Sequence, residues 1–324
     1  MRSQKCLKWT GVIYMNDRFD ILSIGAVLID MVALVEEFPE RDDESFVKDF
    51  KLMYGGAAAN VAVCCSRLGL KTAFSGKIGE DHFGDLLYAD LYREKVQVED
   101  SLRINPEVGT GSCYICVDKH GDRMILAYSG AADTLTLEDL PLDLIKRTEW
   151  VHLSDLRNVG AIEALLDGDI TLNFSMSPGA LIAQNPSRAY RLAQHTKLMV
   201  ASLNEMMQIF RCTEEEIDTI ADELISAYDE RIVVITKGKE GSTIYSKEEI
   251  ITIPAFNVKA VDTTGAGDAY TAGMLYGLCK GMSIKKAGIF ATACSAICVQ
   301  EVGARSGPTD RKEVQRFIKR YGKD

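Results

Sequence analysis

The sequence predicts an α/β fold with a mostly parallel central sheet. Across residues 137–236, short apolar runs alternate with amphipathic runs at the spacing of βαβ units. The strand-like runs are 150–153, 170–174, 198–201 and 231–236, and the helix-like runs are 137–147, 158–166, 186–195 and 214–228. An earlier apolar run, 19–29, is dense enough to be buried on both faces, as strands of parallel sheets are. No repeat or Pro/Gly-rich linker divides the chain, so we expect one main domain.

The composition disfavours two classes of partner. The 324 residues carry a formal net charge of −10, from 47 acidic and 37 basic side chains. The basic residues form no block long enough to line a nucleic-acid groove. No apolar run approaches the ~18–20 residues of a membrane span. We therefore expect neither nucleic acid nor a membrane as a partner.

Cysteine usage indicates a cytoplasmic protein. Nine cysteines, an odd number, are scattered through apolar segments, as reduced thiols are. Cys113 and Cys116, with His120, resemble a zinc knuckle, but they have the pattern of a strand, where positions three apart face opposite ways. Metal binding there is disfavoured. Residues 1–18 lack a signal-peptide pattern and are interpreted as an N-terminal extension, with Met15 as an alternative native start.

The N-terminal half begins with the apolar strand 19–29 and a less regular stretch, 31–54. A glycine pair then opens a small-residue helix over 55–69. A strand at 71–78, a helix from about 79 to 95, and strand-like runs at 110–117 and 122–128 follow. The last two runs are joined by a turn and predict a hairpin. Together, residues 31–54 and 105–128 are expected to form a small β-lid.

The C-terminal half closes the sheet and carries three further helices. A second hairpin is expected from 242–246 and 250–253, and its second strand opens a β-like run over 250–261. Helical patterns cover 269–279, 284–301 and 310–319. Gly281 is typical of the position just after a helix end.

A short polar stretch, residues 262–270 with the sequence DTTGAGDAY, lies between the β-like run and the helix 269–279. Gly265, Ala266 and Gly267 make a strand-to-helix turn with almost no side chain, so backbone N–H groups can converge on an anion at the helix N-terminus. Asp268 lies in the first helical turn. Amides beside a carboxylate suit phosphoryl transfer, because the amides hold the developing charge and the carboxylate takes the hydroxyl proton. The alternative is a glycine-rich turn with a capping aspartate.

The string DTTGAGDAYTAG resembles the signature of the ribokinase-like, or PfkB, carbohydrate and nucleoside kinases. The glycine pair Gly55-Gly56, followed by Asn60 and a helix ending in Leu-Gly, is similar to the second signature of that family. The resemblance implies a three-layer α/β/α domain over 19–324 with the lid inserted at 31–54 and 105–128. It also implies ATP and Mg²⁺ as cofactors. The sequence has no P-loop lysine, so the phosphate is expected to be held by the helix N-terminus.

The resemblance also assigns roles to individual residues. Asp268 is the general base, and Gly265, Ala266 and Gly267 form the anion hole. Substrate contacts are implied for Asp30, Gly55, Gly56 and Asn60, and nucleotide contacts for Asn204, Thr236, Gly238 and Thr292. Asp262 and Thr264, with the loop 303–307, are implied to hold a monovalent cation such as K⁺. Alternatives stay open: a solvated turn for Asp30, helix–sheet packing for the glycine pair, and a plain strand-end turn for Thr236 and Gly238.

Two positions depart from the family pattern. Many members carry Asn-x-x-Glu after a central strand, but here Asn204 is followed by Met207 at the Glu position. Glu205 is a possible substitute, although on a helix it points about 200° away from position 207. Ser177 stands before a proline where relatives often have aspartate, so the local network must differ.

Three functions remain open at this point. The first is an ATP-dependent kinase of a sugar or sugar acid, and the second is a nucleoside kinase of the same fold. The third is an inactive kinase-like scaffold, which the intact turn 265–268 disfavours. The exposed edge of a β-lid also favours pairing with a second copy, so a homodimer through the lid is expected.

Overall fold

The computed structural model describes residues 18–168, 170–227 and 230–322. All but the last residue of the expected N-terminal extension, Met15 included, lies outside the described residues. Within them, no helix combines the length and the apolar character needed to cross a membrane.

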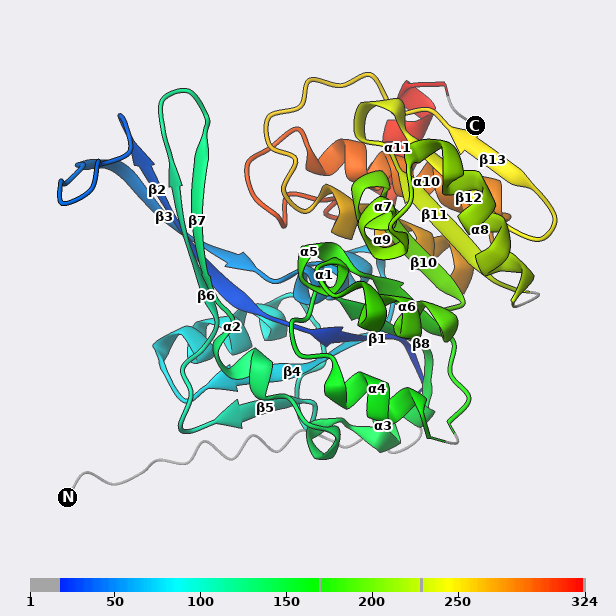
Figure 1. Cartoon of the computed structure of the whole chain (residues 1–324), viewed down its shortest axis with the longest axis horizontal. Helices are drawn as coiled ribbons and strands as arrows, with labels where there is room; N and C mark the ends of the chain where they lie inside the picture. Colours follow the sequence, from blue (N-terminus) through cyan, green and yellow to red (C-terminus); the bar gives the residue numbers. More distant parts are fainter. Residues whose placement is uncertain (1–17, 169, 228–229, 323–324) are drawn as a thin grey trace.

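In the described part of the chain the central sheet has nine strands, in the order β13-β12-β11-β10-β9-β8-β1-β4-β5 (Figure 1). The strands from β11 to β5 are parallel to their neighbours, and β12 and β13 add an antiparallel hairpin at one edge. The strands are β1 (Phe19–Gly25), β4 (Thr72–Gly79), β5 (Leu102–Asn105), β8 (Thr148–Ser154), β9 (Phe174–Ser177), β10 (Leu198–Ser202), β11 (Ile232–Thr236), β12 (Ser242–Tyr245) and β13 (Ile250–Ile253).

Helices cover both faces of this sheet, which makes three layers. On one face pack α1 (Ala57–Leu68), α2 (His82–Arg93), α9 (Ala266–Cys279), α10 (Ile284–Cys298) and α11 (Arg311–Arg320). On the other pack α3 (Leu142–Lys146), α4 (Gly160–Leu166), α5 (Gly179–Ala183), α6 (Pro186–Gln194), α7 (Leu203–Phe210) and α8 (Ile217–Ser226). Burial of these apolar faces against the sheet is the main stabilising term. The expected three-layer α/β/α class is confirmed.

A second sheet projects from the main domain as the lid (Figure 1). Its strand order is β3-β2-β6-β7, with bounds β2 (Leu28–Val35), β3 (Val47–Gly55), β6 (Ser112–Val117) and β7 (Arg123–Tyr128). The register places Asp30, Met53 and Cys113 side by side on one face. The adjoining row holds Leu52, Met31, Tyr114 and Leu126, which therefore share the opposite face.

The expected single strand 19–29 is two strands, and this moves Asp30. Strand β1 ends at Gly25, where a Cβ atom would lie 2.5 Å from the Ser154 carbonyl oxygen, and β2 begins at Leu28. The first belongs to the main sheet and the second to the lid. Both are apolar, because one is buried in the domain core and the other at the root of the lid, so hydropathy alone hides the break. Asp30 therefore lies within a lid strand and does not follow the first strand of the main sheet.

Other expected boundaries also change. Residues 102–105 form the edge strand β5 of the main sheet, so the lid begins after them. The strand expected at 170–174 is β9, Phe174–Ser177, and the helix expected at 137–147 is only a 3-10 turn at Leu137–Asp139 followed by α3. Pro141 divides these two pieces, because proline cannot continue a helical ladder. The run expected to stay extended to 261 leaves the sheet after Ile253, where Pro254 follows.

Candidate active site

The turn before α9 adopts a conformation that its glycine permits. Gly265 has φ 76°, and a Cβ atom there would lie 2.1 Å from the Ala304 carbonyl oxygen. The helix therefore starts at Ala266, three residues earlier than its apolar pattern predicted. The Ala266 N–H donates to the Thr263 carbonyl at 3.2 Å and is committed to the turn. In the described residues, the N–H groups of Gly267 and Asp268 have no such partner, so these two amides are open to an anion.

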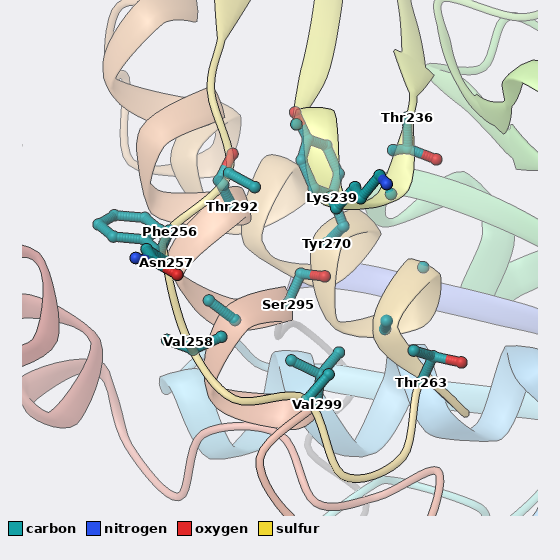
Figure 2. Close-up of a pocket in the computed structure, with 17 residues that line it drawn as sticks. Thr236, Lys239, Phe256, Asn257, Val258, Thr263, Tyr270, Thr292, Ser295 and Val299 are labelled. Atoms are coloured by element: carbon teal, nitrogen blue, oxygen red, sulfur yellow. The ribbon is translucent and has the colours of Figure 1, made fainter.

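Two cavities meet at this turn. The larger, of about 540 Å³, lies between the end of β11, the loop after β13, α9 and α10 (Figure 2). The smaller, of about 360 Å³, lies over the carboxyl ends of β8 to β11. Thr236 and Gly267 line both. Asp268 lines only the smaller cavity, so the carboxylate and the larger cavity lie on either side of the turn.

The volume of the larger cavity lies within the range of small-molecule binding sites. Thr236, Gly238 and Thr292, three of the four residues expected to contact nucleotide, all line it. Figure 2 shows Thr236 on the strand-end side and Thr292 on α10 across from it. The Thr292 hydroxyl donates to the Gly288 carbonyl at 2.8 Å, which leaves its methyl group as the contact surface. The Tyr270 hydroxyl is held by Ser242 at 2.8 Å.

The smaller cavity brings together three carboxylates, of which the sequence predicted one as catalytic. They are Asp268, Asp155 and Glu205. Burial, with further contributions from the charges of Asp155 and Glu205, raises the pKa of Asp268 to about 7, while hydrogen bonding from Asn60 and the charge of Arg305 lower it. A carboxylate that titrates near neutral pH is suited to accept a proton.

Sequence reasoning missed Asp155. It follows β8 directly, has φ 31°, and accepts a hydrogen bond from the Leu181 N–H at 2.8 Å. Burial raises its pKa to about 6. The available signal was its position after a predicted strand, which is where ligands collect in parallel sheets.

The four residues expected at the substrate lie at the root of the lid and in the first turns of α1. The Asn60 side-chain N–H donates to the Asp268 carboxylate at 2.9 Å. A Cβ atom on Gly55 would lie 2.4 Å from the Asp30 carboxylate, so the lid aspartate packs directly against this glycine. Burial raises the pKa of Asp30 to about 6, and the Cys113 thiol, as a hydrogen-bond donor, offsets part of that rise. Gly56, with φ 95°, opens α1 between them.

The family model for the pfkB family of carbohydrate kinases matches residues 18–311. The chain belongs to the pfkB family of carbohydrate kinases. It is 31% identical to a nucleoside kinase of Methanothermobacter thermautotrophicus, over 95% of this chain and 98% of that one. It is 32% identical to an uncharacterized sugar kinase of Archaeoglobus fulgidus, over 75% and 96%. The crystal structure of Methanocaldococcus jannaschii nucleoside kinase, an archaeal member of the ribokinase family, superposes with a TM-score of 0.83 at 26% identity, covering 93% and 98%.

Membership of the pfkB family makes the protein an ATP-dependent phosphotransferase.

Its departures from the family pattern have a local structural account. Asn204 is exposed on α7 and lines neither cavity, whereas Met207 packs against the core. Glu205 reaches the smaller cavity, and its carboxylate also accepts from the Ser202 N–H at 2.8 Å in a capping box. Ser177 shares a hydrogen bond of 2.9 Å with Thr271.

Asp262 and Thr264 are the pair expected to bind a cation. Hydrogen bonds to Asp262 join the turn before α9 to the loop 303–307. One Asp262 oxygen accepts from the Thr264 N–H and hydroxyl at 2.9 and 2.7 Å, and the other accepts from the Gly303 N–H at 2.9 Å. A carboxylate has about four acceptor sites, so Asp262 keeps capacity for one more partner. The cation assignment stays a prediction.

Proposed function

We propose that this kinase phosphorylates a hydroxyl group of a neutral sugar, with Asp268 as the general base. The observation that carries this proposal is the position of Asp268 beside the junction of the two cavities. A nucleotide in the larger cavity would direct its terminal phosphate past Gly267 toward that carboxylate. An acceptor held under the lid would present its hydroxyl from the other side.

The residues divide the reaction between them. The acceptor oxygen attacks the terminal phosphorus, the bond to the bridging oxygen breaks, and ADP leaves with the bond electrons. The hydroxyl proton passes to the Asp268 carboxylate. The open amides of Gly267 and Asp268, at the positive end of the α9 dipole, stabilise the charge on the transferred group.

Charge favours a neutral acceptor over a sugar acid. Among the described residues that line the smaller cavity, three are carboxylates and none is Lys or Arg. Asp30 adds a fourth carboxylate from the lid, and the nearby Arg305 is already paired with Asp90. A further anionic group would be repelled. The nucleoside kinase alternative stays open, because a nucleoside is also neutral and a relative of that name covers 95% of this chain.

Magnesium would enter with the nucleotide. In the described residues no three His, Cys, Asp or Glu side chains are arranged to hold a metal ion. Mg²⁺ usually keeps several waters and binds substrate phosphates, and the carboxylates of Asp155 and Glu205 provide the oxygen-rich, negative surroundings that suit it. When bound, Mg²⁺ would neutralise charge on the phosphates. K⁺ beside Asp262 would stiffen the turn at residues 262–267, here called the anion turn.

We also infer a homodimer through the lid and a cytoplasmic location. The lid face opposite Asp30 exposes large apolar side chains on three of its four strands: Phe50, Leu52, Tyr114, Met124, Leu126 and Tyr128. An apolar patch of this kind typically marks an interaction surface. An apolar face can pack against the same face of a second copy about a twofold axis, and a second copy is the occupant we propose. The free cysteines support a reducing compartment.

The substrate class is tested with an acceptor panel of neutral sugars, nucleosides, sugar acids and sugar phosphates. ADP release with MgATP is measured for each at pH 8. We expect the highest kcat/KM for a neutral sugar, and at least tenfold less for its acid or phosphate. A nucleoside as the best substrate supports the second candidate. ADP release that no acceptor stimulates would reject both, and a preferred sugar acid would reject the charge argument.

A further inference from the structure

Arg305 is a buried charged residue that is connected to Asp268, the candidate base, through the side chain of Asn60. It belongs to the loop 303–307 that follows α10, and its side chain is only 9% exposed. Burying a guanidinium is costly unless it is paired and hydrogen-bonded. The contacts that satisfy it therefore indicate what it is held in place to do.

Those contacts join four parts of the fold. Nη1 pairs with the carboxylate of Asp90 on α2, whose side chain is 3% exposed. Nε donates to the Asn60 side-chain oxygen at 3.0 Å, and Nη2 lies 3.5 Å from the Gly55 carbonyl oxygen at the root of the lid. The guanidinium carbon lies 5.6 Å from the centroid of the Tyr54 ring, within the range of a cation–π contact.

Donor and acceptor chemistry fixes the orientation of the amide between Arg305 and Asp268. A guanidinium only donates, so it must face the Asn60 oxygen. The Asn60 nitrogen then faces Asp268, to whose carboxylate it donates at 2.9 Å. An ionised carboxylate only accepts, so this amide orientation matches the charged base. If the amide turned over, its oxygen would meet Asp268 and favour the protonated form.

We propose that Arg305 is a positioning residue of this kinase: it orients the Asn60 amide so that Asp268 is held as an ionised acceptor facing the phosphoryl site. The ion pair with Asp90 holds the guanidinium in place, and the loop 303–307 brings it there. The inference rests on the proposed function in one respect, the role of Asp268 as the base. The orientation of Asn60 itself does not depend on that role.

Arg305 lowers the pKa of Asp268. The other titratable groups around Asp268 either raise that pKa or carry no charge. Asp155, after β8, and Glu205, on α7, both favour the protonated form. The thiols of Cys64 on α1 and Cys298 on α10 are neutral, because burial raises the pKa of each to about 12. Arg305 is therefore the cation that offsets two carboxylates, and its loss should be visible in the titration of Asp268.

The test follows that titration directly, without substrate. Protein labelled with ¹³C at the aspartate carboxyl carbons is titrated by NMR, and the Asp268 signal is identified by its absence in Asp268→Asn. Arg305→Met should raise the Asp268 midpoint by about one pH unit, a tenfold change in the ionisation constant. Arg305→Lys keeps a donating cation, so its Asp268 midpoint should lie close to that of the wild type. The acid limb of kcat/KM should move to higher pH in parallel.

Arg67→Met is the matched control. Arg67 also supports this loop, donating to the Arg305 carbonyl at 2.7 Å, and pairs with Glu94, but it makes no hydrogen bond to Asn60. It should lower Tm without moving the Asp268 midpoint. An unmoved midpoint in Arg305→Met, with only a lower Tm, would show that Arg305 is merely structural. If Arg305→Met does not fold, Arg305→Gln replaces it, and an unmoved midpoint there overturns the proposal equally. Because the titration uses no acceptor, it tests the role of Arg305 even if the proposed substrate class is wrong.

Discussion

At the scale of single residues, the raised pKa of Asp268 makes its proposed role as general base testable. Asp268→Asn keeps the shape of the side chain but cannot take a proton. We expect kcat to fall by about 10²–10⁴-fold, the usual range for loss of general base catalysis, with ATP binding retained. In the wild type, kcat/KM should be lost as pH falls through about 7, because the base must be ionised. Turnover of the variant at the wild-type rate would remove Asp268 from the mechanism.

The same substitution should stabilise the fold at alkaline pH. The pKa of Asp268 is raised from 3.8 to about 7, so the folded state binds the proton more tightly than the unfolded chain does. A raised folded-state pKa means that stability is lost as pH rises through that pKa. Asp268→Asn carries no charge and avoids this loss. Its Tm should exceed that of the wild type by a few degrees at pH 8 and by much less at pH 5. Equal differences at both pH values would contradict a raised pKa.

At the scale of elements, the turn before α9 holds two glycines whose substitution should have different effects. An added Cβ on Gly267 meets no atom within 4 Å, so the fold tolerates a side chain there. Gly267 nevertheless lines both cavities, and Gly267→Val would intrude where the phosphate passes. We expect loss of most activity with a Tm close to the wild type. Gly265→Val, which would collide with the Ala304 carbonyl, should instead lower Tm sharply. Normal phosphorylation by Gly267→Val would contradict the turn's assigned role.

The loop 303–307 and the anion turn form a second testable unit. Asp262 already ties the two together through the Gly303 N–H, so a cation there would add stiffness to an existing link. We expect modest activation by K⁺ over Na⁺ and an absolute need for Mg²⁺, measured as kcat in matched chloride salts. Equal rates in the two salts would remove the monovalent site and leave the turn unaffected.

At the scale of the whole molecule, the lid face decides the assembly. Light scattering after size exclusion should give a mass near twice 35.7 kDa. Leu126, 64% exposed on β7, lies in the proposed interface, and Leu126→Lys should shift the mass toward the monomer. Ile104→Lys, at a side chain 59% exposed on the edge strand β5 of the main sheet and outside the lid, is the matched control and should leave the mass unchanged. A wild-type monomer at micromolar concentration would refute the lid dimer.

Local chemistry made much of this architecture predictable. Glycines and small residues around 55–69 and 262–273 occur where the backbone turns tightly or exposes its amides. Their spacing in the sequence is therefore enough to identify the two signatures. Continuous apolar runs that alternate with amphipathic runs predicted the parallel sheet, because strands buried on both faces are apolar throughout and the helices that cover them are amphipathic. Thr236, Gly238 and Thr292 were expected at a nucleotide site, and all three line the larger cavity.

Only the tertiary structure decided the contacts between distant segments. The break after Gly25 is hidden because both sides of it are apolar, yet it places Asp30 in the lid. Asp155, Arg305 and Asp90 have no local motif, since each acts through partners tens to hundreds of residues away. Asn204 matched a motif but lies exposed on α7. The sequence thus determined the fold class and the reaction, which depend on local backbone geometry. The packing of α1, α2, α9 and the loop 303–307 determined the hydrogen bonds around Asp268, the proposed base, because hydrogen-bond direction is set by which side chains meet.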